Sequence, residues 1–195
     1  MHIARSVHPL PGEAEREARL IGLLNSFSGR RIAVIGDLIA DEFIYGRVAR
    51  VSREAPVLIL QYDSTDVVPG GAGNAACNVA ALGARVQLVA VAGRDAEGKR
   101  LRSSFRKVDT RGVLTPAGYR TPVKTRILAG GVHSAKQQIV RIDRTGPVGY
   151  DDRTRAAFAK SALKAAGECD AILISDYGAG LMTPALALST SGAPG

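Results

Sequence analysis

The sequence predicts an α/β protein with a mostly parallel sheet flanked by helices and a small antiparallel flap. Two short apolar runs, Arg31–Gly36 and Ala171–Ser175, are each followed directly by aspartate and have the composition of buried parallel strands. Segments of helical periodicity alternate with such runs, which favours a parallel sheet with right-handed crossovers. Residues 43–68 instead form short segments broken around residues 52–56, a pattern typical of antiparallel strands.

The remaining elements follow from periodicity. Leu20, Ile21, Leu24 and Phe27 recur at helical spacing and predict an N-terminal amphipathic helix that ends at Gly29. Helices are also expected over residues 74–82, 95–107 and 151–167, a strand over 85–91, and a hairpin of strands 121–128 and 136–142 joined by residues 129–131.

Three segments are expected along the chain: an N-terminal helical extension (1–30), the α/β domain (31–181) and a truncated or aberrant tail (182–195). In that tail a helix starts at Thr183 and is expected to dissolve. The flap combines the lid-like segments near residues 43–68 and 121–143. Because an α/β sheet ordinarily continues beyond a strand such as the one ending at Ser175, the C-terminal part of the fold is expected to be missing.

The formal net charge is +8, from 26 Lys and Arg against 18 Asp and Glu. A nucleic-acid partner would explain such an excess, but only 5% of the residues are aromatic, none is Trp, and no nucleic-acid motif is present. Binding of a small phosphorylated anion explains the charge equally well, and a solvated basic surface accounts for most of it. We therefore expect no nucleic-acid partner.

Membrane and metal sites are not favoured either. The sequence has no run of about 18 or more apolar residues, so no segment is expected to span a bilayer. The N-terminus lacks the layout of a secretory signal, and a cytoplasmic location is expected. Cys77 and Cys169 are far apart and predict reduced, buried thiols. The histidines form no ligand cluster: His2, His8 and His133.

A glycine-rich loop and an Ala-rich helix make residues 70–93 (GGAGNAACNVAALGARVQLVAVAG) the richest segment. Gly70 and Gly71 let the backbone approach a ligand closely, because no Cβ intervenes. The helix directs its N–H groups and positive dipole end at the same point, and Asn74 adds a hydrogen-bonding side chain. Tight turns also need glycine, and that alternative stays open. A dinucleotide fingerprint is not favoured, because the loop follows an antiparallel segment.

Through its glycines, its small residues and Asn74, the segment 70–93 reproduces the spacing of the first signature of PfkB-type (ribokinase-like) carbohydrate kinases. Residues 35–46 (IGDLIADEFIYG) look like the first strand and substrate loop of these kinases. The resemblance runs from about residue 31 to residue 180. VSREAPV, VPGGAGN, TPVKTRIL, QQIVRID and LISDYGAG are similar to the kinase domain that phosphorylates heptose 7-phosphate in lipopolysaccharide-core precursor synthesis.

The resemblance implies a ribokinase-like fold of which this chain holds the sugar-binding half. In the family an aspartate of the first-strand loop binds sugar hydroxyls, and Asp41 best matches that position. Asp37 stands at the carboxyl end of the strand, where ligands of α/β sheets gather; a helix or turn cap is its alternative role. Gly70, Gly71 and Asn74 match the family's sugar-binding glycines and asparagine.

The flap corresponds in the family to a lid that closes over the sugar and excludes water. Lys124 and Arg126 lie two apart, hence on one face of a strand, where they would bind the phosphate of a sugar phosphate. Arg53 and Arg141 are further basic candidates on the lid. The alternative is a solvated edge face, kept basic against sheet-to-sheet pairing. A homodimer through the lid is also kept as an option.

ATP and Mg²⁺ are the cofactors that the resemblance implies for the full-length family member. The family's catalytic base lies in a Gly-Ala-Gly-Asp segment, which this sequence does not contain, so no catalytic residue is assigned and the base is expected beyond residue 195. Asp176 is a candidate for the phosphate side. Ala179 stands where the subfamily often has Lys, which leaves phosphate handling there open.

Three classes of function remain. The first is an ATP-dependent kinase of a sugar or sugar phosphate, with heptose 7-phosphate converted to the 1,7-bisphosphate, and with this chain alone inactive or nearly so. The second is a non-catalytic sugar-phosphate-binding remnant, or a half-enzyme that works with a complementing chain. The third is a nucleic-acid binder, suggested by charge alone, whose affinity would depend steeply on salt.

Overall fold

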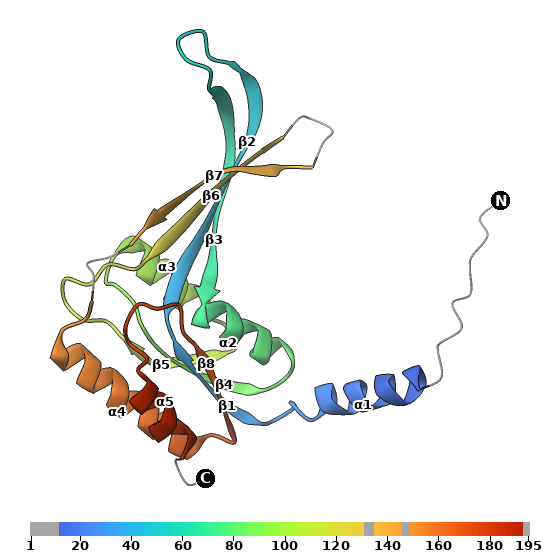
Figure 1. The fold of residues 1–195 in the computed structure, drawn as a ribbon, viewed down its shortest axis with the longest axis vertical. Coiled ribbons are helices and arrows are strands. Elements are labelled where there is room, and N and C mark those ends of the chain that lie inside the picture. Colours follow the sequence, from blue (N-terminus) through green and yellow to red (C-terminus); the bar gives the residue numbers. More distant parts are fainter. Residues whose placement is uncertain (1–11, 131–134, 146–148, 193–195) are drawn as a thin grey trace.

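The computed structural model describes residues 12–130, 135–145 and 149–192. It contains a central sheet of order β5-β4-β1-β8 and a lid sheet of order β3-β2-β6-β7 that projects from it (Figure 1). The strands are β1 (Arg31–Gly36), β2 (Leu38–Val51), β3 (Leu58–Gly71), β4 (Arg85–Val91), β5 (Val108–Leu114), β6 (Val123–Gly130), β7 (Gln137–Arg144) and β8 (Ala171–Ser175). The helices are α1 (Glu13–Asn25), α2 (Ala72–Ala81), α3 (Ala96–Ser104), α4 (Asp152–Glu168) and α5 (Pro184–Ser191).

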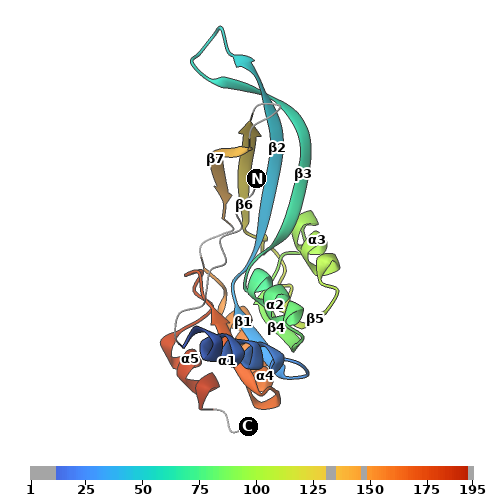
Figure 2. The ribbon, with the colours of Figure 1, turned by 90° about the vertical axis from the view of Figure 1, so that its right-hand side faces the viewer.

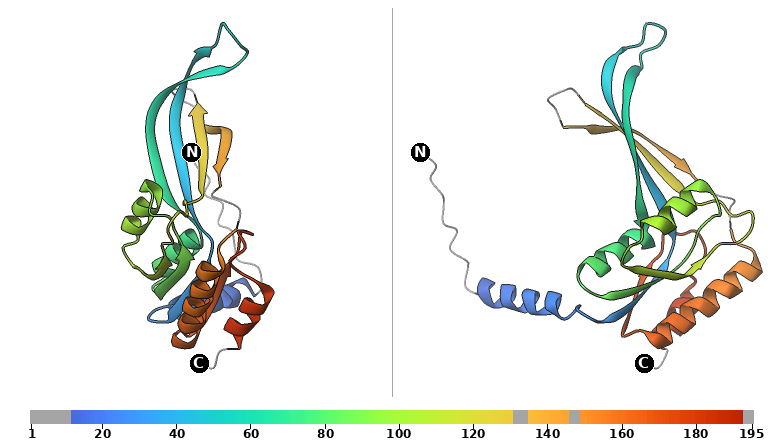
Figure 3. Two further views of the ribbon diagram at one scale, coloured as in Figure 1. Left: turned by 90° about the vertical axis from the view of Figure 1, so that its left-hand side faces the viewer. Right: turned by 180° about the vertical axis from the view of Figure 1, so that it is seen from behind.

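The central sheet is parallel throughout, which confirms the predicted class. Its middle strand β1 is buried on both faces. Ile32 and Val34 pack into a core with α2 and α3, whereas Ala33 and Ile35 pack with Phe158 of α4. Helices α2 and α3 therefore lie on one face of the sheet and α4 on the other, as Figures 2 and 3 show, whereas α1 projects away from the sheet. This sandwich fixes the carboxyl ends of β1 and β8 beside each other.

The lid sheet continues directly from the central sheet, because a single residue separates the end of β1 from the start of β2. β2 and β3 form one antiparallel hairpin, and β6 and β7 form a second. The two hairpins join through β2 and β6, which run parallel, so the lid is mixed rather than purely antiparallel. The reason is topological: both leading strands rise from the same edge of the central sheet. Pairing of two copies through the lid stays a prediction.

The structure differs from the sequence analysis in three elements. Strand β8, expected to be buried, lies at the edge of the central sheet, and its Leu173 and Ile174 are 38% and 39% exposed. Residues Val108–Leu114 form strand β5, which no expectation covered. The helix expected to start at Thr183 and to dissolve from Leu188 continues to Ser191. The Thr183 side chain accepts a hydrogen bond from the Leu186 backbone N–H (3.1 Å) and so caps its start.

Several smaller expectations can be placed as well. No helix within the described ranges is long and apolar enough to cross a membrane. Cys77 and Cys169 are unpaired, as predicted, but half-buried rather than buried, and burial raises the pKa of both thiols. The three histidines and Gly131 of the predicted hairpin turn lie outside the described residues: His2, His8 and His133.

Candidate active site

Asp37 occupies the junction between the two sheets, as the single residue between β1 and β2. Its backbone N–H donates to the Ser175 carbonyl (3.1 Å), and its carbonyl accepts from the Ala72 N–H (2.9 Å) at the start of α2. Its Oδ2 atom accepts from the backbone N–H groups of Tyr177 (2.8 Å) and Ala179 (3.2 Å). One residue thus ties together β8, the loop that follows it, and α2.

The second carboxylate oxygen of Asp37 is in a different situation. The residue is only 3% exposed, and Oδ1 is buried without a hydrogen bond from any described residue. Burial raises the pKa of Asp37, partly offset by the two backbone donors, and the neighbouring Asp176 carboxylate raises it further. Oδ2 therefore has the turn-capping role that was the alternative for Asp37. Oδ1, at the end of β1, accepts no hydrogen bond from a described residue.

The raised pKa of Asp37 predicts a specific pH dependence of stability. A carboxyl with a higher pKa in the folded state stabilises that state at low pH, and this contribution is lost as pH rises through the folded pKa. Asp37→Asn keeps an oxygen for the Tyr177 and Ala179 N–H groups but carries no charge. We therefore expect the variant to gain stability relative to wild type between pH 4 and pH 7, measured by urea denaturation.

Carboxylates with lowered pKa, such as Asp95 and Asp151, give the opposite trend in both proteins, so the difference between the two curves is the readout. Asp66→Asn, on the exposed face of β3, is the matched control and should leave the wild-type profile unchanged. A constant difference between Asp37→Asn and wild type across this pH range would contradict the account of Asp37.

A cavity of about 310 Å³ opens where Asp37 meets the lid. Lys124 of β6 lines the cavity on the side of the lid. The Nζ atom of Lys124 lies 5.1 Å from the centre of the Tyr177 ring. The cavity thus joins an acidic group at the sheet end to a basic group of the lid. Its remaining lining residues are Leu38, Ile39, Tyr119, Pro122, Thr145, Gly149, Tyr150, Gly178 and Ala179.

Arg126 is held by the lid itself. Its Nη1 atom donates to Asp41 Oδ1 at 2.5 Å, and the guanidinium lies 5.3 Å from the centre of the Phe43 ring. Both members of the ion pair are largely shielded, with side-chain exposures of 24% and 21%. Lys124 and Arg126 do share a strand face, but Arg126 has a carboxylate partner, whereas Lys124 has the Tyr177 ring and no carboxylate partner among the described residues. The two residues are therefore not equivalent.

The glycine-rich loop lies against both aspartates. Gly71 has φ +56°, and a Cβ there would overlap the Asp37 carbonyl oxygen, while a Cβ on Gly70 would overlap the Asp41 carboxylate. Replacing Gly71 would therefore shift the backbone. A loss of binding in such a variant could not be told apart from a loss of folding. Asn74 is exposed on α2, where its side chain accepts a hydrogen bond from Asn78 Nδ2 (3.5 Å).

Of the predicted site residues only Asp37 and Lys124 line the cavity, so Asp41, Arg126 and residues 70–74 lie outside its wall, as do the remaining three. Arg53 is exposed in the connection at the tip of the β2–β3 hairpin. Arg141 is exposed on β7 and forms an ion pair with Asp143 (2.6 Å). Asp176 is exposed, and its Oδ1 accepts from the Gly178 N–H (2.9 Å). The structure brings Asp37 and Lys124 to one cavity, with the Asp41–Arg126 pair on the adjoining lid strands.

The sequence analysis did not single out Tyr119 and Tyr150. Both line the cavity, from the loop before β6 and from the residue that precedes the cap of α4. They are 31 positions apart and belong to no local motif, so only the folded chain brings them together.

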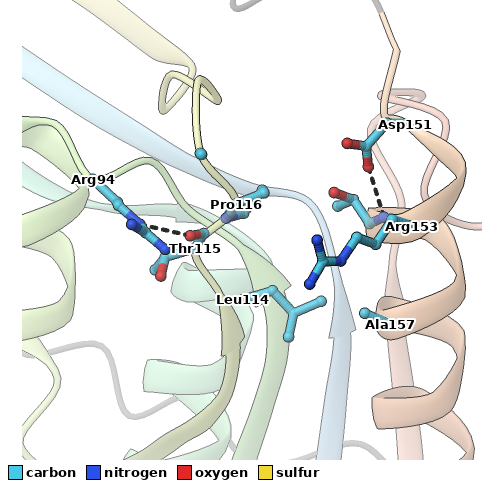
Figure 4. A pocket seen from close by; sticks show the side chains of 9 residues that line it. Arg94, Leu114, Thr115, Pro116, Asp151, Arg153 and Ala157 are labelled. Carbon is cyan, nitrogen blue, oxygen red and sulfur yellow. Dashed lines mark hydrogen bonds between the residues drawn. The ribbon is translucent and has the colours of Figure 1, made fainter.

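A second hollow, of about 390 Å³, lies between the end of β5 and the start of α4 (Figure 4). Its basic residues are Arg94 and Arg153, and both are exposed. The polar groups drawn there have local roles: Arg94 Nε donates to the Thr115 carbonyl (2.9 Å), and Asp151 accepts from the Thr154 N–H (2.7 Å) as the cap of α4. We therefore place the candidate site at the Asp37 cavity.

The pfkB family carbohydrate kinase model matches residues 30–145, which cover β1, the whole lid and the glycine-rich loop. The chain belongs to this family. Among curated relatives, the "Bifunctional protein HldE" of Gluconobacter oxydans is 37% identical over 164 residues, covering 83% of this chain and 33% of that protein. The protein of the same name from Geobacter metallireducens is 42% identical over 159 residues, covering 78% and 31%. The chain thus spans about a third of the length of these relatives.

Solved structures of carbohydrate kinases share the fold. Phosphofructokinase-2 from Escherichia coli, in complex with fructose-6-phosphate, superposes with a TM-score of 0.55 at 18% identity, covering 84% of this chain and 51% of that one. A carbohydrate kinase from Agrobacterium tumefaciens gives a TM-score of 0.50 at 22% identity, covering 84% and 57%. At these identities the likeness concerns the ribokinase-like α/β fold, which agrees with the expected class.

Proposed function

We propose that this pfkB-family chain forms the sugar-phosphate side of a kinase that transfers phosphate from ATP to heptose 7-phosphate, giving the 1,7-bisphosphate. The observation that carries the proposal is the cavity that is lined both by the sheet-end residue Asp37 and by Lys124 of the lid. Carboxylates accept hydrogen bonds from sugar hydroxyls, and an ammonium group attracts a phosphate. A site with both groups fits a phosphorylated sugar better than either a neutral sugar or an anion alone.

The roles within the site follow from its contacts. Asp37 and Asp41 would accept from sugar hydroxyls, with Arg126 holding Asp41 in place through their ion pair. Lys124 would contact the phosphate. Gly70, Gly71 and Asn74 would line the sugar side at the start of α2, as their match to the family signature suggests. Arg53, Arg141 and Asp176 would approach a ligand only after the lid closes, because none lines the cavity in this conformation.

ATP and Mg²⁺ belong to the proposed reaction, and together they supply the phosphoryl group and charge neutralisation. The described residues fit neither of them well. They contain no group of three or more His, Cys, Asp or Glu placed to hold a metal ion. Asp37 Oδ2 and Asp176 Oδ1 already accept backbone N–H groups. We therefore assign no residue of this chain to Mg²⁺ or to the nucleotide.

A second function is a sugar-phosphate binder that transfers no phosphate by itself, or that needs a complementing chain. The absence of a Gly-Ala-Gly-Asp segment from the sequence favours it, since the family resemblance places the catalytic base in such a segment. Separate calorimetric titrations with heptose 7-phosphate and with Mg·ATP distinguish the two functions. A binder takes up the sugar phosphate alone, and a working kinase binds both. A folded chain that binds neither would overturn the proposed function in either form.

A further inference from the structure

Three of the five tyrosines in the chain gather at the one cavity proposed to hold the sugar. Tyr119 and Tyr150 form a pair there. Their rings stack with centroids 5.1 Å apart, and their hydroxyl oxygens are 2.8 Å apart, within hydrogen-bond distance. Both residues are half-buried. The pair joins the loop before β6 to the start of α4, and both residues line the cavity.

The hydrogen-bonding capacity of the pair exceeds what it uses. Each phenol carries one hydrogen and two acceptor lone pairs. Within the pair one hydrogen is shared, so the other remains to be donated. The hydroxyls form no further hydrogen bond with any described residue. Burial, and the charge of nearby Asp37, raise the pKa of both phenols, so both stay protonated at neutral pH. The pair at the cavity wall therefore has an O–H donor that no described residue uses.

The pair can donate one hydrogen and accept at its remaining lone pairs. This matches the hydroxyls of a polyol, because each of them both donates and accepts. Aromatic rings at such a wall also suit the C–H surface of a sugar, because they bury apolar area without competing for its hydroxyls. A phosphate group alone would not need this arrangement, since phosphate oxygens at neutral pH chiefly accept. The tyrosine pair thus suits the hydroxylated carbon skeleton of a sugar phosphate rather than its phosphate group.

We propose that the Tyr119–Tyr150 pair is a specificity-determining element that donates its second phenolic hydrogen to a hydroxyl oxygen of the bound sugar skeleton. The assignment rests on the proposed function. The tyrosine pair would bind the hydroxyl groups of the sugar, and Lys124 would bind its phosphate. A purely structural alternative is that the pair only fastens the loop before β6 to α4. If the pair has only that structural role, removing its hydroxyls lowers the affinity for all ligands equally. If it binds the polyol, only the affinity for ligands with a hydroxylated skeleton falls.

The test uses Tyr→Phe variants, which retain the rings and remove the hydroxyls. Tyr119→Phe, Tyr150→Phe and the double variant are titrated with heptose 7-phosphate and with inorganic phosphate. Tyr62→Phe, 64% exposed on β3, is the matched control. We expect the double variant to bind heptose 7-phosphate about 3- to 10-fold more weakly, the usual range for one neutral hydrogen bond. Its affinity for inorganic phosphate, and the affinities of Tyr62→Phe, should equal those of wild type.

Wild-type affinity for heptose 7-phosphate in the double variant would overturn the inference and leave the proposed function intact. Equal losses for both ligands would also overturn it, in favour of the structural role. A wild-type chain that does not bind heptose 7-phosphate would overturn both. Ultraviolet difference spectroscopy on the wild-type chain keeps the test independent of variant folding. Heptose 7-phosphate should perturb the tyrosine absorption more than inorganic phosphate does, because phosphate at Lys124 lies beside Tyr177 alone. An unperturbed spectrum with saturating sugar phosphate contradicts the inference.

Discussion

The 195-residue chain, mixed with Mg·ATP and heptose 7-phosphate, is expected to release ADP at close to the uncatalysed rate. Phosphoryl transfer to a hydroxyl needs a base near the attacking oxygen and donors for the transferred phosphate. General-base assistance contributes about 10²- to 10⁴-fold, and anion-stabilising donors about 10²- to 10³-fold each. The sequence contains no Gly-Ala-Gly-Asp segment, which is where the family resemblance places the base, so no residue is assigned to supply the first factor.

A coupled ADP-release assay measures this rate, with the sugar omitted as the control for ATP hydrolysis. Binding of heptose 7-phosphate is checked in the same preparation, so that an unfolded sample is not mistaken for an inactive one. Sugar-dependent turnover near 1 s⁻¹ or faster, within the ordinary range of enzymes, would contradict the expectation. The base would then have to be sought among Asp37, Asp41 and Asp176, by replacing each with Asn.

Lys124→Ala is expected to weaken binding of heptose 7-phosphate about 10- to 100-fold, since a charge-assisted contact is worth about 1.5–3 kcal/mol. Binding of heptose without the phosphate should change little. Arg126→Ala should weaken both ligands, because it releases Asp41 from its 2.5 Å ion pair rather than removing a phosphate contact. Lys124 and Arg126, which share one strand face, are thus expected to differ: the first substitution weakens binding of the phosphorylated sugar alone, and the second weakens binding of both sugars.

Arg47→Ala is the matched control for these variants. Arg47 also lies on the lid and also carries a positive charge, but it pairs with Asp63 (3.0 Å) and does not line the cavity. It should leave both affinities unchanged, which separates a local contact from the general effect of net charge. If Lys124→Ala weakens heptose and heptose 7-phosphate by the same factor, Lys124 supports lid folding rather than phosphate binding.

Local sequence was sufficient to predict the elements whose composition matches their burial. Strand β1 is apolar and buried on both faces, and α2 follows the glycine pair at the position where a side chain would collide with Asp37. Strand β5 escaped prediction because it lies at the sheet edge and carries Asp109 and Arg111, which bind each other at its exposed side. An edge strand needs fewer apolar residues, so its composition carries a weaker signal.

The contacts that build the candidate site are mostly non-local, and the sequence alone could not supply them. That Asp37 ends a strand was readable, but its bonds to Tyr177 and Ala179 span about 140 positions. The pairing of Asp41 with Arg126 depends on the parallel register of β2 and β6, which no turn or motif encodes. The Tyr119–Tyr150 pair likewise arises only when a loop and a helix start meet.

The central claim, that the Asp37 cavity and the lid bind a phosphorylated sugar, is tested most directly by calorimetry on the wild-type chain. Heptose 7-phosphate and heptose are titrated in turn at the same pH and ionic strength. We predict saturable binding of one heptose 7-phosphate per chain, about 10-fold or more tighter than heptose, as expected for one charge-assisted contact to the phosphate. A cooperatively folded chain that gives no saturable heat with heptose 7-phosphate, or equal affinities for the two sugars, would contradict the claim.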